Sequence, residues 1–456
     1  MSPKWVYVAA ASCILLGGDL CAAFECVGTK NATTLQGCIN AAAQSSSSDH
    51  TVLVSGSWDL RNAGGQPIQV IVKPGVAVVG AGTRWGTTFN VHYGQYGSAD
   101  DFDDAAIYLM RGSRLEGIAF WYPDQSITAS SMTAYSPTVA LLEDQAFEEP
   151  NGVLIHNNLF MNSYAAIFLG SYRSLTHDMG PHERAVVSNN RFGICYRGII
   201  VDLNTDVDRF LMNHFHPQLL KYNAGTPQNP VEGGASQAMK DWLKANQVAM
   251  EIRHSDWPLV EGLHVGGALY GVWLRQGSTG RVGAPQIQQS SFNSCSKGVY
   301  SNEASNAPAE VSLTENNFGG CGTAVYLKGV GRVTISNNVF WNSAAHHVEL
   351  VSPLHFDVDG NTASIWGNNY SFLKVSGTGS KYGSVSGNAG GKATGAIPAA
   401  IDVANSTRVV VVANTFEISS SYPVVRFQST TSNSIAGANR GGSGVQNLGT
   451  SNSVWP

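Results

Sequence analysis

Carboxylates and arginines recur at related positions in successive segments of this chain. The acids are Asp202, Asp206, Glu251 and Asp256, and the neighbouring cations are Arg253 and Arg275. A protonated carboxyl and an ionised carboxylate can act as general acid and general base on the same bond. Arginine keeps its charge at any working pH, so it neutralises a substrate anion rather than taking a proton. Our candidate catalytic residues are Glu251, Asp202, Arg253, Asp256 and Arg275.

Aromatic and basic side chains occupy the matching positions of the following segments: Trp273, Tyr300, Tyr326 and Lys328. Flat aromatic rings stack on the apolar faces of sugar rings, and an arginine fork binds a carboxylate or sulfate with two hydrogen bonds. We expect this row, together with His254 and His216, to bind a linear sugar polymer. The alternative is that the rings pack under a loop and that the cations are ordinary surface charges.

Two kinds of reaction fit this set of residues. Hydrolysis needs two carboxylates about 5–5.5 Å apart for retention or about 6.5–9.5 Å apart for inversion. β-Elimination needs a base, and the candidates are His254, Tyr300 and Lys328. It also needs cations, such as Arg253 and Arg275, that neutralise the uronate carboxylate. Each carboxylate taken alone can instead be the salt-bridge partner of a neighbouring arginine.

Glu251 carries the main prediction for the catalytic centre. It occupies a position that aromatic residues fill in later segments, so it interrupts a sugar-stacking row. We expect those neighbours and the 217–247 segment to exclude water from its carboxyl group, which favours proton donation. Arg253 lies two residues further on, on the same side of a strand, where it can hold a substrate anion or keep a second carboxylate ionised.

The elements that must position these residues repeat along the chain. The segment NNFGGCGTAVYLKG at 316–329 has near-copies at 157–170, 189–202 and 290–303, each with an aliphatic residue seven positions after an aromatic one. Aliphatic residues at alternate positions are typical of a strand with one buried face. A period of roughly 22–32 residues indicates a solenoid in which each repeat packs only against its neighbours. Leucine-rich repeats fit poorly because they need Leu at several fixed positions. We predict an all-β fold, a parallel β-helix.

If the repeated aliphatic residues point inward, the residues between them form two outward columns. The first column holds Phe168, Ile200, Glu251, Trp273, Tyr300 and Tyr326. The second holds Gly170, Asp202, Arg253, Arg275, Asn302 and Lys328. Rungs stacked about 4.8 Å apart turn such columns into a linear groove. An asparagine also recurs just before the aromatic residue, and we interpret it as a structural ladder along the stack. These asparagines are Asn158, Asn190, Asn317, Asn338 and Asn414.

The chain divides into a leader, a repeat domain and a tail. Residues 1–23 have Lys4, an apolar run and then small residues, which is the layout of a secretory signal peptide. A membrane anchor fits less well because Asp19 interrupts the run. Residues 24–430 form the predicted β-helix domain, with an insertion at 217–247 that ends in a short amphipathic helix. Residues 431–456 form a tail rich in Gly, Ser and Asn.

The segment NATTLQGCINAAAQ predicts a helix over 34–43 that caps the first coil, with Thr33 or Thr34 as its N-cap. Cys26 and Cys38 flank a short loop, and in an oxidising compartment we expect a disulfide between them. Three further cysteines share one repeat position, where a buried, small, apolar role is the simplest interpretation. They are Cys195, Cys295 and Cys321.

No zinc spacing of cysteines and histidines is present, and the sequence leaves open whether a calcium ion assists. Asn213-His214-Phe215-His216 lacks a visible third ligand, so we interpret it as a polar lip of the groove rather than a metal site. His346-His347 replaces a small-aliphatic pair, a local irregularity of the repeat. The net charge of −5 in 456 residues argues against general nucleic-acid binding. We expect a monomer that has no membrane contact after signal cleavage.

The segments TLQGCINAAAQ and KPGVAVVGAGT resemble the opening of right-handed parallel β-helix proteins of the pectate lyase superfamily. The likeness in rhythm covers residues 26–430, and WYPDQ (121–125) and VAMEIRHSDW (248–257) resemble segments of secreted β-helix proteins of this kind. The superfamily contains polysaccharide lyases, glycoside hydrolases and phage tailspike depolymerases. The polygalacturonase combination of Asn-Thr-Asp with a later Asp-Asp and Gly-His-Gly is not found, so the resemblance does not select one of these reactions.

The residues and the resemblance together imply a secreted enzyme, extracellular or periplasmic, that degrades a linear polysaccharide. The cations favour an acidic, uronic-acid-containing substrate, and they favour the lyase slightly over the glycoside hydrolase. The alternative from a different class is a non-catalytic glycan-binding or adhesin β-helix, in which aromatic and arginine side chains suffice and the carboxylates only pair with cations.

Overall fold

The computed structural model describes residues 23–46, 48–82, 86–92, 104–143, 150–172, 179–216, 235–277, 280–303, 305–366, 369–393 and 395–455. The chain forms two compact units, which we describe one by one. Unit 1 comprises Met1–Ile199 and His216–Lys240, and unit 2 comprises Ile200–Phe215 and Asp241–Pro456. Residues 1–22 of the expected signal peptide and residues 217–234 of the expected insertion lie outside the described part of the chain.

Unit 1 contains one α-helix at its start and strands of three parallel sheets. The helix is α1 (Ala32–Ala43). Sheet 1 contains β1 (Phe24–Glu25), β2 (Thr51–Val54), β5 (Ala77–Gly80), β8 (Arg114–Glu116), β11 (Leu154–His156) and β15 (Val186–Ser188). Sheet 2 contains β4 (Val70–Val72), β7 (Ile107–Leu109), β10 (Val139–Leu142) and β13 (Ala165–Tyr172), and β14 (Met179–Gly180) pairs antiparallel with β13. Sheet 3 contains β3 (Ser57–Asp59), β6 (Thr87–Asn90), β9 (Ile118–Trp121), β12 (Leu159–Met161) and β16 (Arg191–Phe192).

Unit 2 also contains strands of three parallel sheets, which are numbered as in unit 1. Sheet 1 contains β18 (Arg209–Leu211), β21 (Leu259–Glu261), β24 (Gln286–Gln288), β27 (Glu310–Thr314), β30 (Arg332–Ser336), β33 (His355–Asp359), β36 (Tyr382–Ser386), β39 (Val409–Val412), β42 (Ile435–Gly437) and β44 (Ser453–Val454). Sheet 2 contains β20 (Val248–Ile252), β23 (Tyr270–Leu274), β26 (Lys297–Ser301), β29 (Thr323–Lys328), β32 (Val348–Val351), β35 (Leu373–Ser376), β38 (Ile401–Val403), β41 (Val425–Phe427) and β43 (Val445–Asn447). Sheet 3 contains β19 (His214–Phe215), β22 (His264–Gly266), β25 (Ser291–Asn293), β28 (Asn317–Gly319), β31 (Val339–Ser343), β34 (Thr362–Trp366), β37 (Ala389–Ala393) and β40 (Thr415–Glu417).

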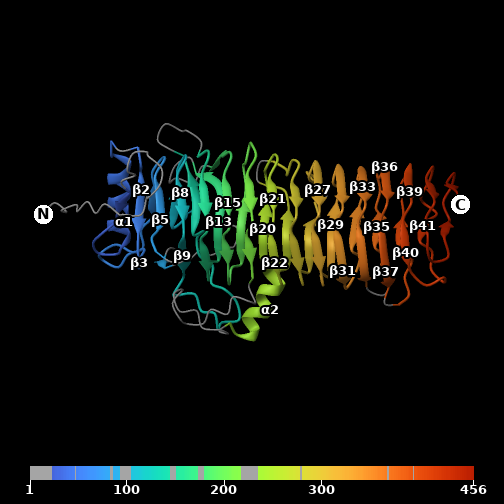
Figure 1. Cartoon of the computed structure of the whole chain (residues 1–456), viewed down its shortest axis with the longest axis horizontal. Coiled ribbons are helices and arrows are strands. Elements are labelled where there is room, and N and C mark those ends of the chain that lie inside the picture. Colours follow the sequence, from blue (N-terminus) through green and yellow to red (C-terminus); the bar gives the residue numbers. More distant parts are fainter. Residues whose placement is uncertain are drawn as a thin grey trace, which may run out of the picture. The chain divides into compact units, whose positions relative to one another are not determined.

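Within unit 2, three consecutive strands make one coil, and each strand pairs in parallel with its counterpart one coil later. Figure 1 shows these strands, coloured yellow-green to red, side by side along the unit. The strands β21, β22 and β23, for example, pair with β24, β25 and β26. Each sheet thus receives one strand from each coil. The predicted all-β parallel β-helix is confirmed.

The core of each coil is built from the repeated aromatic and aliphatic residues. Phe292, Phe318 and Phe340 are buried on sheet 3, and consecutive rings stack with centroids 5.0 Å apart. A Cβ on Gly271 would come within 2.4 Å of the Phe292 ring, so glycine is needed there. Burial of a phenylalanine side chain stabilises a fold by roughly 1.5–3 kcal/mol. The aromatic residue and the aliphatic residue seven positions later are therefore parts of one packed layer.

An asparagine ladder runs beside this core in unit 2. Each side-chain amide donates to the carbonyl oxygen of the next asparagine side chain at 2.8–3.0 Å. The ladder consists of Asn316, Asn338, Asn361, Asn388, Asn414 and Asn439. The predicted structural role is confirmed, but the choice of Asn317 is wrong by one residue. Asn316 precedes Phe318 by two positions, as Asn338 precedes Phe340, whereas Asn317 is exposed and accepts a bond from Trp341 Nε1.

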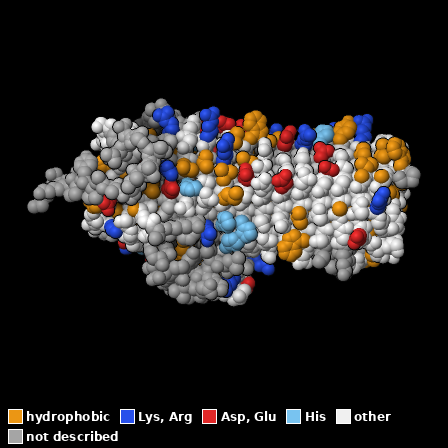
Figure 2. All heavy atoms as spheres, viewed as in Figure 1, with side chains coloured by type: hydrophobic (Ala, Val, Ile, Leu, Met, Phe, Trp, Pro, Cys, Tyr) orange, Lys and Arg blue, Asp and Glu red, His pale blue; other side chains and the backbone are white. Residues whose placement is uncertain are grey.

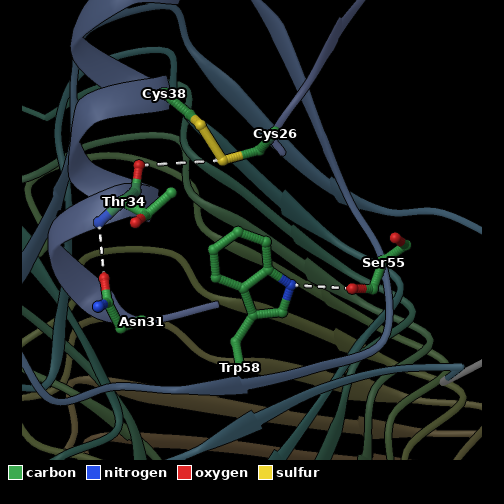
Figure 3. The surroundings of a disulfide bond; sticks show 6 residues. All are labelled: Cys26, Asn31, Thr34, Cys38, Ser55 and Trp58. Atoms are coloured by element: carbon green, nitrogen blue, oxygen red, sulfur yellow. Dashed lines mark hydrogen bonds between the residues drawn. A yellow bond between two sulfur atoms is a disulfide. The ribbon is translucent and has the colours of Figure 1, made fainter. Parts of the chain in front are cut away.

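The N-terminal helix of unit 1 is tied to the first strands by a disulfide (Figure 3). Cys26 and Cys38 form the predicted bond across a separation of 12 residues. Helix α1 starts two residues earlier than predicted, because the side chain of Asn31 rather than Thr33 or Thr34 is the N-cap and accepts from Thr34 N at 2.9 Å. An Asn side chain satisfies one of the backbone N–H groups that a helix start leaves open. Cys195, Cys295 and Cys321 are buried, as predicted.

Two remaining segments correspond to features noted in the sequence. The helix α2 (Gln237–Asn246) forms the described end of the expected insertion, with Met239 and Leu243 buried. Strands continue beyond residue 430 as β42, β43 and β44, so the Gly/Ser/Asn-rich tail takes part in the sheets. Within the described ranges, neither helix has the length and apolar character needed to cross a membrane.

Candidate functional site

The first outward column predicted from the sequence is present on sheet 2 of unit 2. Glu251 of β20 pairs in register with Trp273 of β23, Trp273 with Tyr300 of β26, and Tyr300 with Tyr326 of β29. The residues on either side, such as Met250 and Ile252, are buried in the core. Because a shift of one residue would move every side chain to the opposite face, this pairing fixes which residues point outward.

Glu251 is buried among arginines although it lies on the outward face. Its side chain has 0% of its surface exposed, and its Oε1 accepts a hydrogen bond from Arg253 Nε at 2.7 Å. The same oxygen lies 3.3 Å from Nη1 of Arg275, whose side chain is 27% exposed. A charge removed from water is tolerated when opposite charges surround it. Glu251 therefore fixes the positions of two guanidinium groups.

Asp202 is the second carboxylate of this cluster, and it lies across Arg253 from Glu251. Its Oδ2 is 3.9 Å from Arg253 Nη1, and its side chain is 6% exposed. Burial raises the pKa of Asp202 above its ordinary value, and the nearby charge of Arg253 lowers it in part. The backbone of Gly277 lies so close that a Cβ there would come within 2.7 Å of Asp202 Oδ1. Asp202 is thus a carboxyl group that can hold a proton at the edge of the arginine cluster.

Four aromatic rings form a half-exposed cluster beside these charges. They are Tyr270, Trp273, Tyr300 and Tyr326. The Tyr270 and Tyr300 rings stack with centroids 4.3 Å apart, and the Arg275 guanidinium lies 4.7 Å from the Trp273 ring centroid. Such contacts hold the rings in a fixed arrangement. Each of the four rings keeps part of its surface exposed to solvent.

Two members of this cluster were missed in the sequence. Tyr270 and Lys297 are paired in register and lie three residues before Trp273 and Tyr300 in their strands. The Lys297 Nζ lies 5.3 Å from the Tyr326 ring centroid and donates to Thr323 Oγ1 at 3.1 Å. Partial burial lowers the pKa of Lys297. The recurrence of a polar or aromatic residue three positions before the first outward column is the signal that identifies them.

The remaining candidate residues have different environments. His254 is half-buried, and its ring lies within 2.7 Å of the position that a Cβ on Gly280 would occupy. Asp256 is exposed, with its backbone carbonyl accepting from Ala284 N at 2.7 Å. Lys328 is half-buried at the end of β29. His216 belongs to unit 1, whereas the other candidates belong to unit 2. Asp202, Glu251, Arg253 and Arg275 are thus the charged candidates that form one connected cluster.

A ladder of alternating charges continues the column beyond the aromatic residues, and the sequence reading did not identify it. Tyr326 pairs with Glu349, and the following partners are Lys374, Asp402 and Arg426. Lys374 Nζ lies 2.9 Å from Glu349 Oε1, and Arg426 contacts Asp402 through two hydrogen bonds of 2.8 and 2.7 Å. These charges neutralise one another, so the part of the column with half-exposed rings and cations ends at Tyr326.

A cavity of about 400 Å³ begins where β29 ends. Gly329, the residue after Lys328, lines it together with Arg281, Asn306 and Pro308. Arg281 supplies a positive charge that faces this space. Among the residues that the structure describes, no group of three or more His, Cys, Asp or Glu side chains is arranged to hold a metal ion.

A family model described as a right handed beta helix region matches residues 249–416, which contain most of this cluster. The protein is a right-handed parallel β-helix. No curated protein sequence matches this β-helix.

Several solved structures are similar to this chain. A double mutant of the tailspike protein of E. coli bacteriophage HK620, in complex with a pentasaccharide, is 12% identical, with a TM-score of 0.50 and coverage of 93% of this chain and 74% of that chain. The Dettilon tailspike protein is 12% identical, with a TM-score of 0.47, and the match covers 91% of this chain but only 64% of that chain. The A-module of the Azotobacter vinelandii mannuronan C-5 epimerase is 11% identical, with a TM-score of 0.41 and coverage of 93% and 92%. At these identities the likeness concerns the fold.

Proposed function

We propose that this β-helix binds a linear acidic polysaccharide along sheet 2 of unit 2 and cleaves it beside Asp202. The observation that carries the proposal is the contact between a connected cluster of charges and a half-exposed aromatic cluster, which Arg275 joins by contacting both Glu251 and Trp273. Aromatic rings bind the apolar faces of sugars, and guanidinium groups bind their carboxylates. The HK620 tailspike, a protein of similar fold, binds a pentasaccharide, which supports a sugar polymer as the ligand class.

The contacts favour a division of roles that differs from the sequence-based hypothesis. Glu251 was predicted to donate the proton, but its carboxylate has no exposed surface and pairs with two arginines. We assign Glu251 the role of a positioning residue that orients Arg253 and Arg275 toward a substrate carboxylate. Asp202, whose pKa is raised by burial, is the proton donor to the leaving-group oxygen.

Both β-elimination and hydrolysis can use the proton donor and the arginines of this arrangement. The two reactions differ in what acts on the substrate next: a base that removes a proton in β-elimination, and a water molecule in hydrolysis. In β-elimination a base removes the proton at C5 while arginine charges stabilise the negative charge that develops on the uronate. Lys297 is a candidate for this base because its lowered pKa makes the neutral amine more accessible. His254 is a further candidate, since its ring lies near the Asp202 end of the cluster, and Tyr300 and Lys328 of the sequence-based hypothesis remain candidates as well. We favour β-elimination because the two arginines of the cluster can neutralise the uronate carboxylate on which negative charge develops.

Purified protein should be incubated with uronate polymers (polygalacturonate, alginate) and neutral polymers (starch, cellulose), with new reducing ends and unsaturated products measured in parallel. We expect new reducing ends with a uronate polymer and none with the neutral ones. Unsaturated ends would identify a lyase, and saturated ends a hydrolase. Binding without any new reducing ends would favour the alternative, a non-catalytic glycan-binding β-helix, for which the buried ion pairs of Glu251 are a sufficient role.

A further inference from the structure

A second outward column, on sheet 1 of unit 2, carries aromatic and basic side chains that the proposed function does not use. Arg332 of β30 pairs in register with His355 of β33, and His355 with Tyr382 of β36. Arg408, just before β39, continues the column, with Nη1 donating to the Tyr382 hydroxyl at 2.6 Å. Figure 2 shows basic, histidine, hydrophobic and again basic side chains in succession along the upper edge, where Figure 1 labels β33 and β36.

The four side chains form one ordered array. The His355 and Tyr382 rings stack with centroids 5.2 Å apart and planes only 5° apart. The Arg408 guanidinium lies 5.3 Å from the Tyr382 ring centroid. Arg332 Nη2 lies 4.0 Å from Asp357 Oδ2. Asp357 is the next outward-facing residue of β33 after His355. Each ring therefore has a planar neighbour, and the array is bounded by a guanidinium group at either end.

A cavity of about 400 Å³ lies over this array. Its walls are the four side chains of the array together with Asp357 and Ser384. A space of this volume lies within the range of small ligand sites. It offers cations for an anionic group and a carboxylate and a hydroxyl for the hydroxyl groups of a ligand.

Packing does not account for this composition. Neighbouring outward positions on sheet 1 hold small polar residues, such as Ser312 and Thr334, which is usual for a solvated sheet face. Tyr382 by contrast is 43% exposed, and His355 and both arginines are exposed as well. Exposed tyrosine and arginine together are the residue types most enriched at binding hot spots. The gathering of an exposed tyrosine, a histidine and two arginines at one place on this face indicates a ligand.

We infer that this array is a second, non-catalytic binding site for an anionic saccharide. Arg332 and Arg408 bind carboxylate or sulfate groups, and the His355–Tyr382 pair contacts the apolar parts of the sugar rings. The two arginines are three rungs apart, which is about 14 Å at the spacing of paired strands. The site therefore takes a short extended segment of several sugars. Since it lies on sheet 1 while the proposed cleavage site lies on sheet 2, it holds the polymer without taking part in the reaction.

The test uses the full chain carrying Trp273→Ala and Arg275→Ala, so that binding at the first site is removed. The probes are hexagalacturonate, a sulfated hexasaccharide and neutral maltohexaose, and the readout is isothermal titration calorimetry at low ionic strength. We expect one remaining site for the anionic probes and none for maltohexaose. Adding Tyr382→Ala, or separately Arg408→Gln, should weaken this binding at least tenfold.

The matched control is Trp341→Ala, which removes an exposed aromatic residue from sheet 3. We expect it to leave the affinity unchanged. Equal affinity with and without Tyr382→Ala and Arg408→Gln, in variants whose circular dichroism and Tm match the parent, would overturn the inference. Because the measurement is binding in a background that lacks the first site, a failure to detect polysaccharide cleavage does not affect its outcome.

Discussion

Glu251 and Arg253 are joined by a hydrogen bond of 2.7 Å between carboxylate and guanidinium, and both side chains are buried on the outward face of sheet 2. The two residues are separated by one core residue, Ile252, so they project on the same side of β20. A charged pair of this kind is stable only as a pair, because removal of one partner leaves the other charge buried. The substrate-facing arginines of the proposed site therefore depend on Glu251.

The first prediction concerns Glu251→Gln. The amide keeps the shape of the side chain but loses its charge, so Arg253 and Arg275 are no longer held in place. We expect KM for a uronate polymer to rise about tenfold or more, as for the loss of a charge-assisted contact. The pH profile of kcat should keep its shape, since Glu251 does not transfer the proton. A change in the pH profile with unchanged KM would show that Glu251 is the proton donor after all.

Asp202→Asn tests the proton donor. We expect kcat to fall by about 10²–10⁴-fold, the usual contribution of a general acid, while KM changes little. In the wild type, activity should decline as the pH rises through the raised pKa of Asp202, because the donor loses its proton. Steady-state kinetics across pH for both proteins provide the check. A wild-type rate in the Asn variant would contradict the assignment.

The pKa of Asp202 also has a consequence for stability. Because the folded-state pKa is raised, the folded protein binds more protons than the unfolded chain between the ordinary value of about 3.9 and the raised value. The free energy of unfolding of wild type relative to Asp202→Asn should therefore be largest in acid and should fall as the pH rises through this window. Urea denaturation at several pH values measures it, and an increase with pH would contradict the sign.

His347 gives a pH dependence of the opposite sign. It is buried with Ser343 Oγ 2.6 Å from its Nδ1, and burial lowers its pKa to about 3. Between about pH 6.5 and about pH 3 the unfolded chain binds the proton and the folded protein does not, so stability falls on acidification by about 1.4 kcal/mol per pH unit. His347→Asn should remove that contribution from the slope of the free energy of unfolding against pH, measured by urea denaturation at several pH values. An unchanged slope would show that His347 accepts its proton in the folded protein.

The asparagine ladder is tested by Asn361→Ala. Asn361 donates to Asn388 Oδ1 at 2.8 Å and to Ile335 O at 2.9 Å, and all these groups are buried. Its loss leaves several polar groups unsatisfied, which costs on the order of 3 kcal/mol. The matched control is Asn317→Ala, an exposed asparagine whose loss should cost about 0.5 kcal/mol or less. Similar destabilisation by both changes would argue against the ladder.

The outward column could be predicted from the sequence because the repeat supplies its own register. The spacing from Phe292 to Val299 and from Phe318 to Val325 fixes the inward positions, and Tyr300 and Tyr326 must then point outward. Glu251 was placed in this column because its neighbour Met250 lies 22 residues before Val272, and the pairing of Glu251 with Trp273 agrees. Alternation of faces along a strand is strict enough for such an inference.

The repeat pattern does not predict which side chains contact one another. The sequence assigns Glu251 to the outward face of its strand. Its burial depends on the rotamer with which Arg275 of the next coil turns toward it, and the sequence does not specify that rotamer. Asn316 and Asn317 are adjacent residues of one type, and only the two-residue spacing to the following phenylalanine, which Asn338 and Asn414 share, identifies Asn316 as the ladder member. The array around Tyr382 does not follow from the outward columns of the repeat motif, because its members lie on sheet 1 and those columns lie on sheet 2.

The central claim, that sheet 2 of unit 2 holds an acidic glycan beside Asp202, is tested most directly by a crystal structure of Asp202→Asn with hexagalacturonate. The Asn substitution is chosen to prevent cleavage while the arginines and rings remain. The account predicts sugar rings against Trp273 and Tyr300 and a uronate carboxylate within hydrogen-bonding distance of the Arg275 guanidinium. A saturating ligand bound elsewhere, with these side chains in contact only with solvent, would contradict it.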